Sequence, residues 1–141
     1  MRGVLYISLV ATFASLSSIA AAHKNLACPA EALGFQRLKT ADAEIAYRWE
    51  PSELKVGRFF ALEVVACRGS GIEAVEDIAI DATMPAHGHG MNYRPATQRI
   101  APGHHRFTGL MLHMPGTWRV TFELLQGGKR TRLTHEVSLR R

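Results

Sequence analysis

Histidine and methionine side chains gather in one stretch of the sequence, residues 84–114. This stretch holds five of the seven histidines and four of the five methionines, and it contains no aspartate or glutamate. Imidazole suits copper, zinc and nickel and thioether sulfur selects Cu(I), whereas calcium and magnesium need oxygen ligands. The composition of the stretch therefore predicts binding of a soft or borderline metal ion, and we expect copper.

The candidate ligands are densest in the segment Met84 to Met91, which reads MPAHGHGM. His87 and His89 alternate with glycine, and glycine allows backbone angles that let a loop turn its side chains onto one centre. A later strand adds further donors at its end, whereas its first residues would lie about 30 Å from that end if it is fully extended. The predicted metal ligands are His87, His89, Met91, His113 and Met114.

Packing and solvation are alternatives for several of these side chains. Met84 continues the apolar alternation of the strand before it and is expected in the core, and packing is also an alternative for Met111 and Met114. His87 and His89 could also hold their loop through hydrogen bonds alone.

Structural roles are also weighed for the remaining histidines of the predicted sandwich, although either end of the later strand could supply ligands together with the loop. His104 and His105 follow the turn signal Pro102-Gly103 and are expected to be turn residues in solvent. His135 alternates in phase with apolar neighbours and is expected to be a partly buried or hydrogen-bonded strand residue.

The segments that must position this stretch alternate between apolar and polar residues with a period of two. Turn signals separate them at intervals of about 8–12 residues, which favours an immunoglobulin-like antiparallel β-sandwich of about seven strands. A helical turn or two near Pro29–Leu38 is the only helix expected. The predicted strands are 43–49, 58–67, 77–84, 97–101, 105–114, 118–124 and 130–139.

The first 22 residues have the pattern of a signal peptide. A positive start is followed by an apolar run and then by Ala20-Ala21-Ala22, which resembles a signal peptidase site. We therefore expect a periplasmic or secreted protein, with an uncleaved N-terminal anchor as the alternative. The predicted organisation is a signal peptide (1–22), an N-terminal segment (23–41) and a β-sandwich domain (42–141).

Two cysteines and one histidine near the predicted cleavage site add further expectations. In an oxidising compartment Cys28 and Cys67 can pair in a disulfide, which would tie the N-terminal segment to the domain. Lipidation of Cys28 is the alternative, because the residues before it faintly resemble a lipoprotein site. Cleavage after Ala22 would make His23 the N-terminus, where its amine and imidazole could chelate one copper ion.

Other functional classes find little support in the sequence. The formal net charge is +5, but the basic residues are scattered and the chain is expected to be exported, so no nucleic-acid partner is expected. We find no nucleophile paired with a base, no acid pair and no phosphate loop, so an enzyme is not expected, apart from oxidative copper chemistry if His23 is the N-terminus.

The paired motifs of the His/Met stretch resemble a known family. The segment 84–91, then Gly103, then FTGLMLHMPGTW over 107–118 resemble the YtkA-like domain family, which is related to the FixH-like proteins. The resemblance covers about residues 42–139. It implies a small exported or membrane-anchored immunoglobulin-like β-sandwich, and an association with copper handling or with respiratory oxidase assembly.

Two functional hypotheses follow. In the first, the protein binds or carries copper and exchanges it with a donor or acceptor protein or a respiratory membrane complex. In the second, the sandwich is a non-metal interaction module that assists assembly of a membrane or respiratory complex. Binding led by histidine should weaken below about pH 6, because imidazole must be neutral to coordinate a metal.

Overall fold

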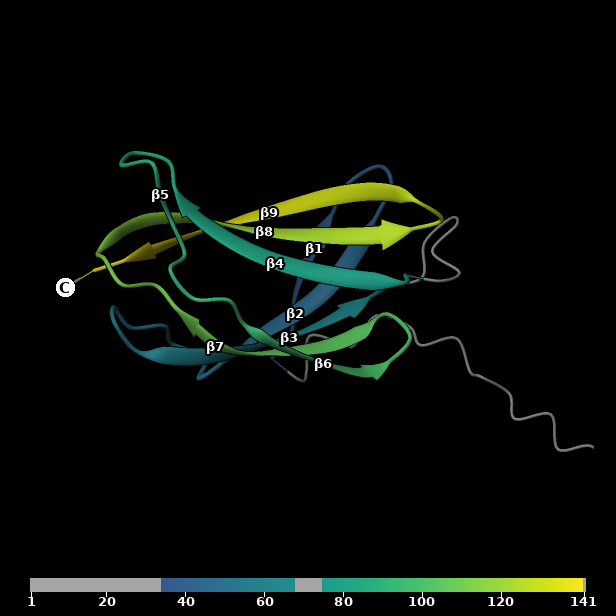
Figure 1. The fold of residues 1–141 in the computed structure, drawn as a ribbon, viewed down its shortest axis with the longest axis horizontal. Coiled ribbons are helices and arrows are strands. Elements are labelled where there is room, and N and C mark those ends of the chain that lie inside the picture. The colour runs from purple at the N-terminus through teal and green to yellow at the C-terminus, as the bar shows by residue number, and fades with distance from the viewer. Residues whose placement is uncertain (1–33, 68–74, 141) are drawn as a thin grey trace, which may run out of the picture.

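The computed structural model describes residues 34–67 and 75–140, and this part of the chain forms nine strands and no helix. They pair into two antiparallel sheets, with orders β1-β2-β3-β7-β6 and β5-β4-β8-β9, that face each other (Figure 1). The predicted antiparallel β-sandwich is confirmed. The strands are β1 (Gln36–Lys39), β2 (Glu44–Glu50), β3 (Phe59–Ala66), β4 (Asp77–Met84), β5 (His89–Gly90), β6 (Ala96–Ala101), β7 (His104–Met111), β8 (Gly116–Gln126) and β9 (Lys129–Leu139).

The core lies between the two sheets and follows the alternation of the strands. On β8, Trp118, Val120, Phe122 and Leu124 are buried, and an exposed or half-buried polar residue stands between each pair. Side chains of a strand point alternately to the two faces, so each sheet buries one face against the other. Tyr47 on β2 contacts Phe122 across the interior, with ring centres 4.9 Å apart.

Seven of the nine strands correspond to predicted ones, and β1 and β5 are additional. The helical turn expected near Pro29–Leu38 is wrong where that segment is described, because Gln36–Lys39 is a strand. It pairs with β2, and the Tyr47 hydroxyl donates a hydrogen bond to Gln36 Oε1 over 2.8 Å. This strand lies in the segment 23–41, so the first sheet starts before residue 42.

A bulge in β7 changes which side chains face the core. Phe60 pairs with Leu110 but Leu62 pairs with Phe107, so β7 carries one extra residue between these pairs. Gly109 lies there with φ of 78°, a left-handed conformation that glycine adopts without strain. Leu110 and Leu112 therefore share the inner face with Phe107, where strict alternation would have placed Met111 and His113 instead.

Several predictions fall outside the described residues. They are the signal peptide 1–22, the copper-chelating His23 and lipidation at Cys28. Cys67 is buried beside Phe35 and Val65, but Cys28 lies outside the described residues, so their disulfide stays a prediction. In the described part, no helix is long and apolar enough to cross a membrane.

Candidate functional site

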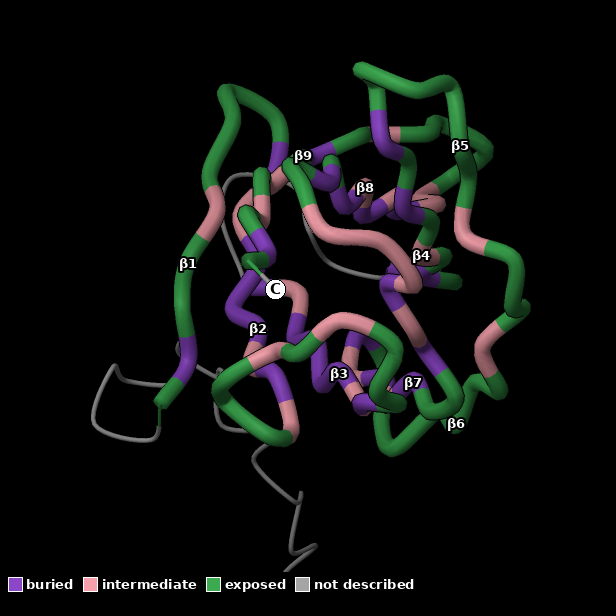
Figure 2. Tube along the Cα trace, turned by 90° about the vertical axis from the view of Figure 1, so that its left-hand side faces the viewer, coloured by how far each residue is buried: buried purple, intermediate pink, exposed green. Residues whose placement is uncertain are grey.

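Three histidine rings meet at one end of the sandwich. His87 lies in the turn after β4, His89 begins β5, and His113 lies in the connection between β7 and β8. The ring centres of His87 and His89 are 6.1 Å apart, and those of His89 and His113 are 6.4 Å apart. Figure 2 views this end, where the loop that enters β5 is exposed. Segments distant in sequence thus bring together the three predicted imidazole ligands.

The loop that carries His87 and His89 is held by a few backbone hydrogen bonds. The His87 amide donates to the Met84 carbonyl over 3.1 Å, and the Met91 amide donates to the Ala82 carbonyl over 2.8 Å. Between them, Gly88 turns the chain with φ of 64°. The two rings stack with an interplanar angle of 28°, so this tight turn presents two imidazoles side by side.

His113 is positioned by a buried tryptophan. Its ring packs edge-on against Trp118, with ring centres 5.3 Å apart, and Trp118 is fully buried. The Trp118 Nε1 donates to the Met114 carbonyl over 2.9 Å, which anchors the connection before β8. The Nδ1 atom of His113 is buried and has no hydrogen-bond partner among the described residues. A buried polar atom of this kind is unusual unless another group satisfies it.

Three methionines on the segments that carry these histidines pack in the core or against it. Met84 is buried in the core, which confirms the expected packing role. Its Cε atom lies 2.6 Å from the position that a Cβ on Gly116 would occupy, so the chain passes very close to it. Met91 and Met114 are partly buried and pack against the core cluster. Packing is therefore one role of Met91 and Met114, and because they are only partly buried their thioethers stay candidate ligands.

The three imidazole rings lie almost as close together as rings that bind one metal ion, but they do not form a complete metal site. Two imidazoles that share one ion at about 2.0–2.1 Å have ring centres about 5–6 Å apart. The separations of 6.1 and 6.4 Å are at or slightly above this range. No group of three His, Cys, Asp or Glu side chains within residues 34–67 and 75–140 has the arrangement of a metal site. Because His87 and His89 are exposed, rotation of their side chains is the movement that would close it.

The expectation that His104 and His105 are solvated turn residues is wrong. Gly103, with φ of 68°, completes the turn, and its carbonyl accepts a hydrogen bond from the Ala66 amide over 2.7 Å. Both histidines therefore belong to β7, and His105 is buried in the interior. Burial lowers the pKa of His105, although the nearby carboxylate of Asp77 partly opposes this.

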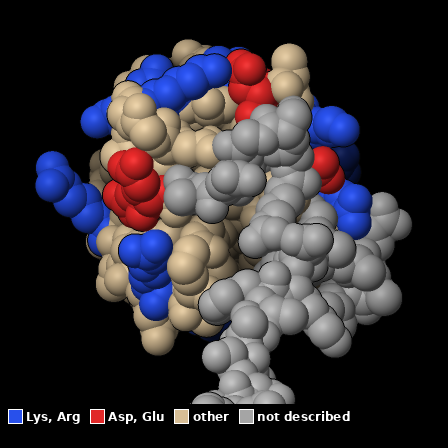
Figure 3. All heavy atoms as spheres, turned by 90° about the vertical axis from the view of Figure 1, so that its right-hand side faces the viewer, with Lys and Arg blue, Asp and Glu red and all other residues tan. Residues whose placement is uncertain are grey.

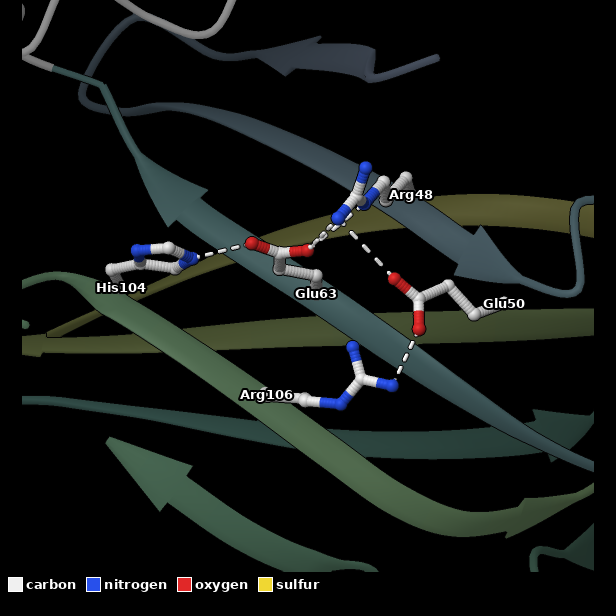
Figure 4. A network of polar contacts seen from close by, with 5 residues as sticks. All are labelled: Arg48, Glu50, Glu63, His104 and Arg106. Atoms are coloured by element: carbon white, nitrogen blue, oxygen red, sulfur yellow. Dashed lines mark hydrogen bonds and ion pairs between the residues drawn. The ribbon is translucent and has the colours of Figure 1, made fainter. Parts of the chain in front are cut away.

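His104 joins an ion-pair network on the outer face of the β1-β2-β3-β7-β6 sheet (Figure 4). His104 Nε2 lies 2.7 Å from Glu63 Oε1, and Arg48 Nη2 lies 2.7 Å from Glu63 Oε2. Arg48 and Arg106 also contact Glu50. Burial tends to raise the pKa of Glu63, but its hydrogen bonds with His104 and Arg48 outweigh burial and lower it.

This network is not evident from the sequence alone. The alternation of β3 places Glu63 on the polar face, but only the register pairs it with Arg48 on β2 and with Arg106 on β7. The available signal for this network was that residues of opposite charge stand on neighbouring strands. Each of the five side chains pairs with at least one other, so the network is a structural feature of the sheet rather than an open site.

His135 behaves as predicted. It is half-buried on β9, and its ring centre lies 5.6 Å from that of Tyr47 and 6.3 Å from that of Trp49. Burial lowers its pKa.

At the opposite end of the sandwich, where undescribed residues do not cover the surface, basic and acidic side chains lie interspersed (Figure 3).

Comparison with known proteins supports the fold and leaves the function open. The chain matches no protein-family model, and it matches no curated protein. It is similar in structure to a DUF4426 family protein from Pseudomonas aeruginosa PAO1, with a TM-score of 0.53 and 14% sequence identity. The match covers 76% of this chain and 95% of that protein. At this identity the likeness shows a shared fold.

Proposed function

We propose that this protein binds copper at the end of the sandwich and carries it to or from another protein. The observation that supports this is the convergence of His87, His89 and His113, whose neighbouring ring centres lie 6.1 and 6.4 Å apart. Imidazole and thioether donors without nearby carboxylates in the sequence favour copper over calcium or magnesium. The proposed ligands are His87, His89 and His113, with Met91 and Met114 available to favour the reduced ion.

The position of the ligands suits exchange rather than permanent storage. His87 and His89 are exposed on a short loop, whereas His113 is fixed against Trp118 in the framework. An exposed pair of ligands facing a fixed one can release an ion stepwise to a partner. The resemblance to YtkA-like proteins fits such a role in the periplasm, with a copper donor or acceptor protein or a respiratory membrane complex as the partner.

The first experiment is a copper titration with chelator competition, using Cu(II) and Cu(I) separately, on the wild type and the H87A/H89A double variant. We expect wild-type binding tighter than about 1 µM, a loss of more than tenfold in the variant, and quenching of Trp118 fluorescence by Cu(II). His104→Gln is the matched control, because His104 pairs with Glu63 on the outer face of the sheet and should leave copper binding unchanged.

The pH dependence separates the two kinds of ligand. If imidazoles lead, affinity should fall below about pH 6, because protons compete for the ring nitrogens. If thioethers lead, affinity should stay nearly constant over the same range. Absence of binding tighter than about 1 µM in the wild type, for either oxidation state, would refute the proposal.

A further inference from the structure

A second surface feature lies beside the C-terminal half of β9 and includes none of the three histidines of the cluster. It is an open groove of about 730 Å³ between this strand and the loop that follows β2. Apolar side chains line much of it: Trp49 from β2, Leu54 and Val56 from the loop, and Val137 and Leu139 from β9. A concave surface with apolar side chains is the usual form of a binding site.

The strand that borders the groove is an edge of its sheet. In the described residues β9 pairs only with β8, so no strand is hydrogen-bonded to its other side, although β1 packs against part of it. With 11 residues it is as long as any strand described, and its inward-facing residues line the groove. An exposed sheet edge offers backbone donors and acceptors to an extended peptide, which can add as a further strand.

The rim of the groove is mainly cationic. Lys55 and Arg58 lie on the loop side and Arg140 directly follows β9, whereas Glu53 is the only acidic residue among those that line the groove. These side chains surround an apolar floor, so the surface is complementary to a segment that carries both carboxylates and apolar groups. Electrostatic complementarity of this kind favours an acidic partner over a basic one.

We propose that this groove binds an extended acidic segment of another protein, which adds as a strand to the free edge of β9. Alternate side chains of such a strand would point to opposite faces. One set would lie over Leu54, Val56 and Val137, and the other would place carboxylates near Arg58 and Arg140. This binding site uses none of the proposed copper ligands and does not depend on copper binding.

The test uses the full chain and two blocked ten-residue peptides, one alternating Glu with Val and the other alternating Lys with Val. Fluorescence anisotropy should give saturable binding of the Glu–Val peptide and at least tenfold weaker binding of the Lys–Val peptide. The R58E/R140E variant should lose at least tenfold in affinity. The matched control is R94E/R99E, which makes the same change in net charge outside the groove and should lose less than twofold.

Hydrogen exchange tests how the peptide binds. Strand addition should slow the exchange of backbone amides over residues 135–139 when the Glu–Val peptide is present. No saturable binding would refute the proposal, as would equal losses in the two variants. Binding without protection of β9 would refute strand addition. Self-association of the chain through β9, detected by sedimentation and abolished in R58E/R140E, would assign the surface to a second copy and also overturn the proposal.

Discussion

Replacement of Glu63 by glutamine tests whether the ion-pair network stabilises the sandwich. Glu63 is 8% exposed and faces His104 at 2.7 Å and Arg48 at 2.7 Å. The amide of glutamine has nearly the same shape, so the change removes the charge and leaves the packing in place. A hydrogen bond to a charged group contributes about 1.5–3 kcal/mol. Arg48 is 37% exposed, which weakens its share through solvent screening.

We therefore expect Glu63→Gln to lower the free energy of unfolding by about 2 kcal/mol in total. The entropy of unfolding of about 100 ordered residues is about 0.2 kcal/mol per degree, so the midpoint should fall by about 10 °C. Thermal denaturation followed by circular dichroism at pH 7 measures this. The control is Glu136→Gln, which removes the exposed pair with Arg119 and should cost less than about 0.5 kcal/mol.

The effect of Glu63→Gln on the free energy of unfolding should also change with pH in a known direction. The pKa of Glu63 is lower in the folded protein than its ordinary value, so its stabilising contribution is present above about pH 4.5. This contribution is lost as the pH falls through the folded-state pKa. The difference between wild type and Glu63→Gln should therefore be largest near neutral pH and shrink as the pH falls through the lowered pKa of Glu63. Equal effects of Glu63→Gln and Glu136→Gln, or a difference that grows in acid, would refute the reasoning.

Three further predictions concern the core and the cysteines. Gly116→Ala should lower the free energy of unfolding by about 1–3 kcal/mol in urea denaturation, because its Cβ would lie 2.6 Å from Met84 Cε and its φ is 128°; an unchanged midpoint would contradict the close contact. Burial raises the pKa of Tyr47 to about 12, because it disfavours the charged tyrosinate. The contribution of the neutral Tyr47 side chain to stability is therefore fully present below about pH 10 and is lost as the pH rises through about 12. Ultraviolet titration should show a tyrosinate step near pH 12 that is absent in Tyr47→Phe, and a step near pH 12 that this substitution leaves unchanged would contradict the assignment. If Cys28 and Cys67 pair, alkylation should label them only after reduction, and Cys67→Ser should cost about 3–4 kcal/mol; labelling of the native protein would exclude the bridge.

The fold could be predicted where alternation alone decides the structure. On β4, Ile78, Ala82 and Met84 are buried between exposed neighbours, and the strand runs over the predicted residues 77–84. On β7 the alternation misled, because the left-handed conformation of Gly109 inserts an extra residue and reverses the faces beyond it. Such a bulge depends on how β3 pairs, which the sequence of β7 alone does not contain.

The candidate site could be predicted only where the local sequence decides it, and not where a partner strand does. The spacing of His87 and His89 placed them on one glycine-rich loop, and the fold brings His113 beside them. The burial of His105 could not be predicted, since a polar ring after a Pro-Gly pair resembles a solvated turn until the partner strand is known. The short strand β1 was missed because four residues gain their stability from β2 rather than from their own sequence.

The order of the strands also has a consequence for how quickly the chain can fold. The central pairs of both sheets join distant parts of the sequence: Phe59 of β3 lies opposite Met111 of β7, and Asp77 of β4 lies opposite Leu125 of β8. Each pairing must close a long loop before any of its contacts form, so the average contact order is high. Such sandwiches fold in milliseconds to seconds rather than microseconds. Until β8 arrives, β3 and β4 expose apolar residues that only the complete sandwich covers.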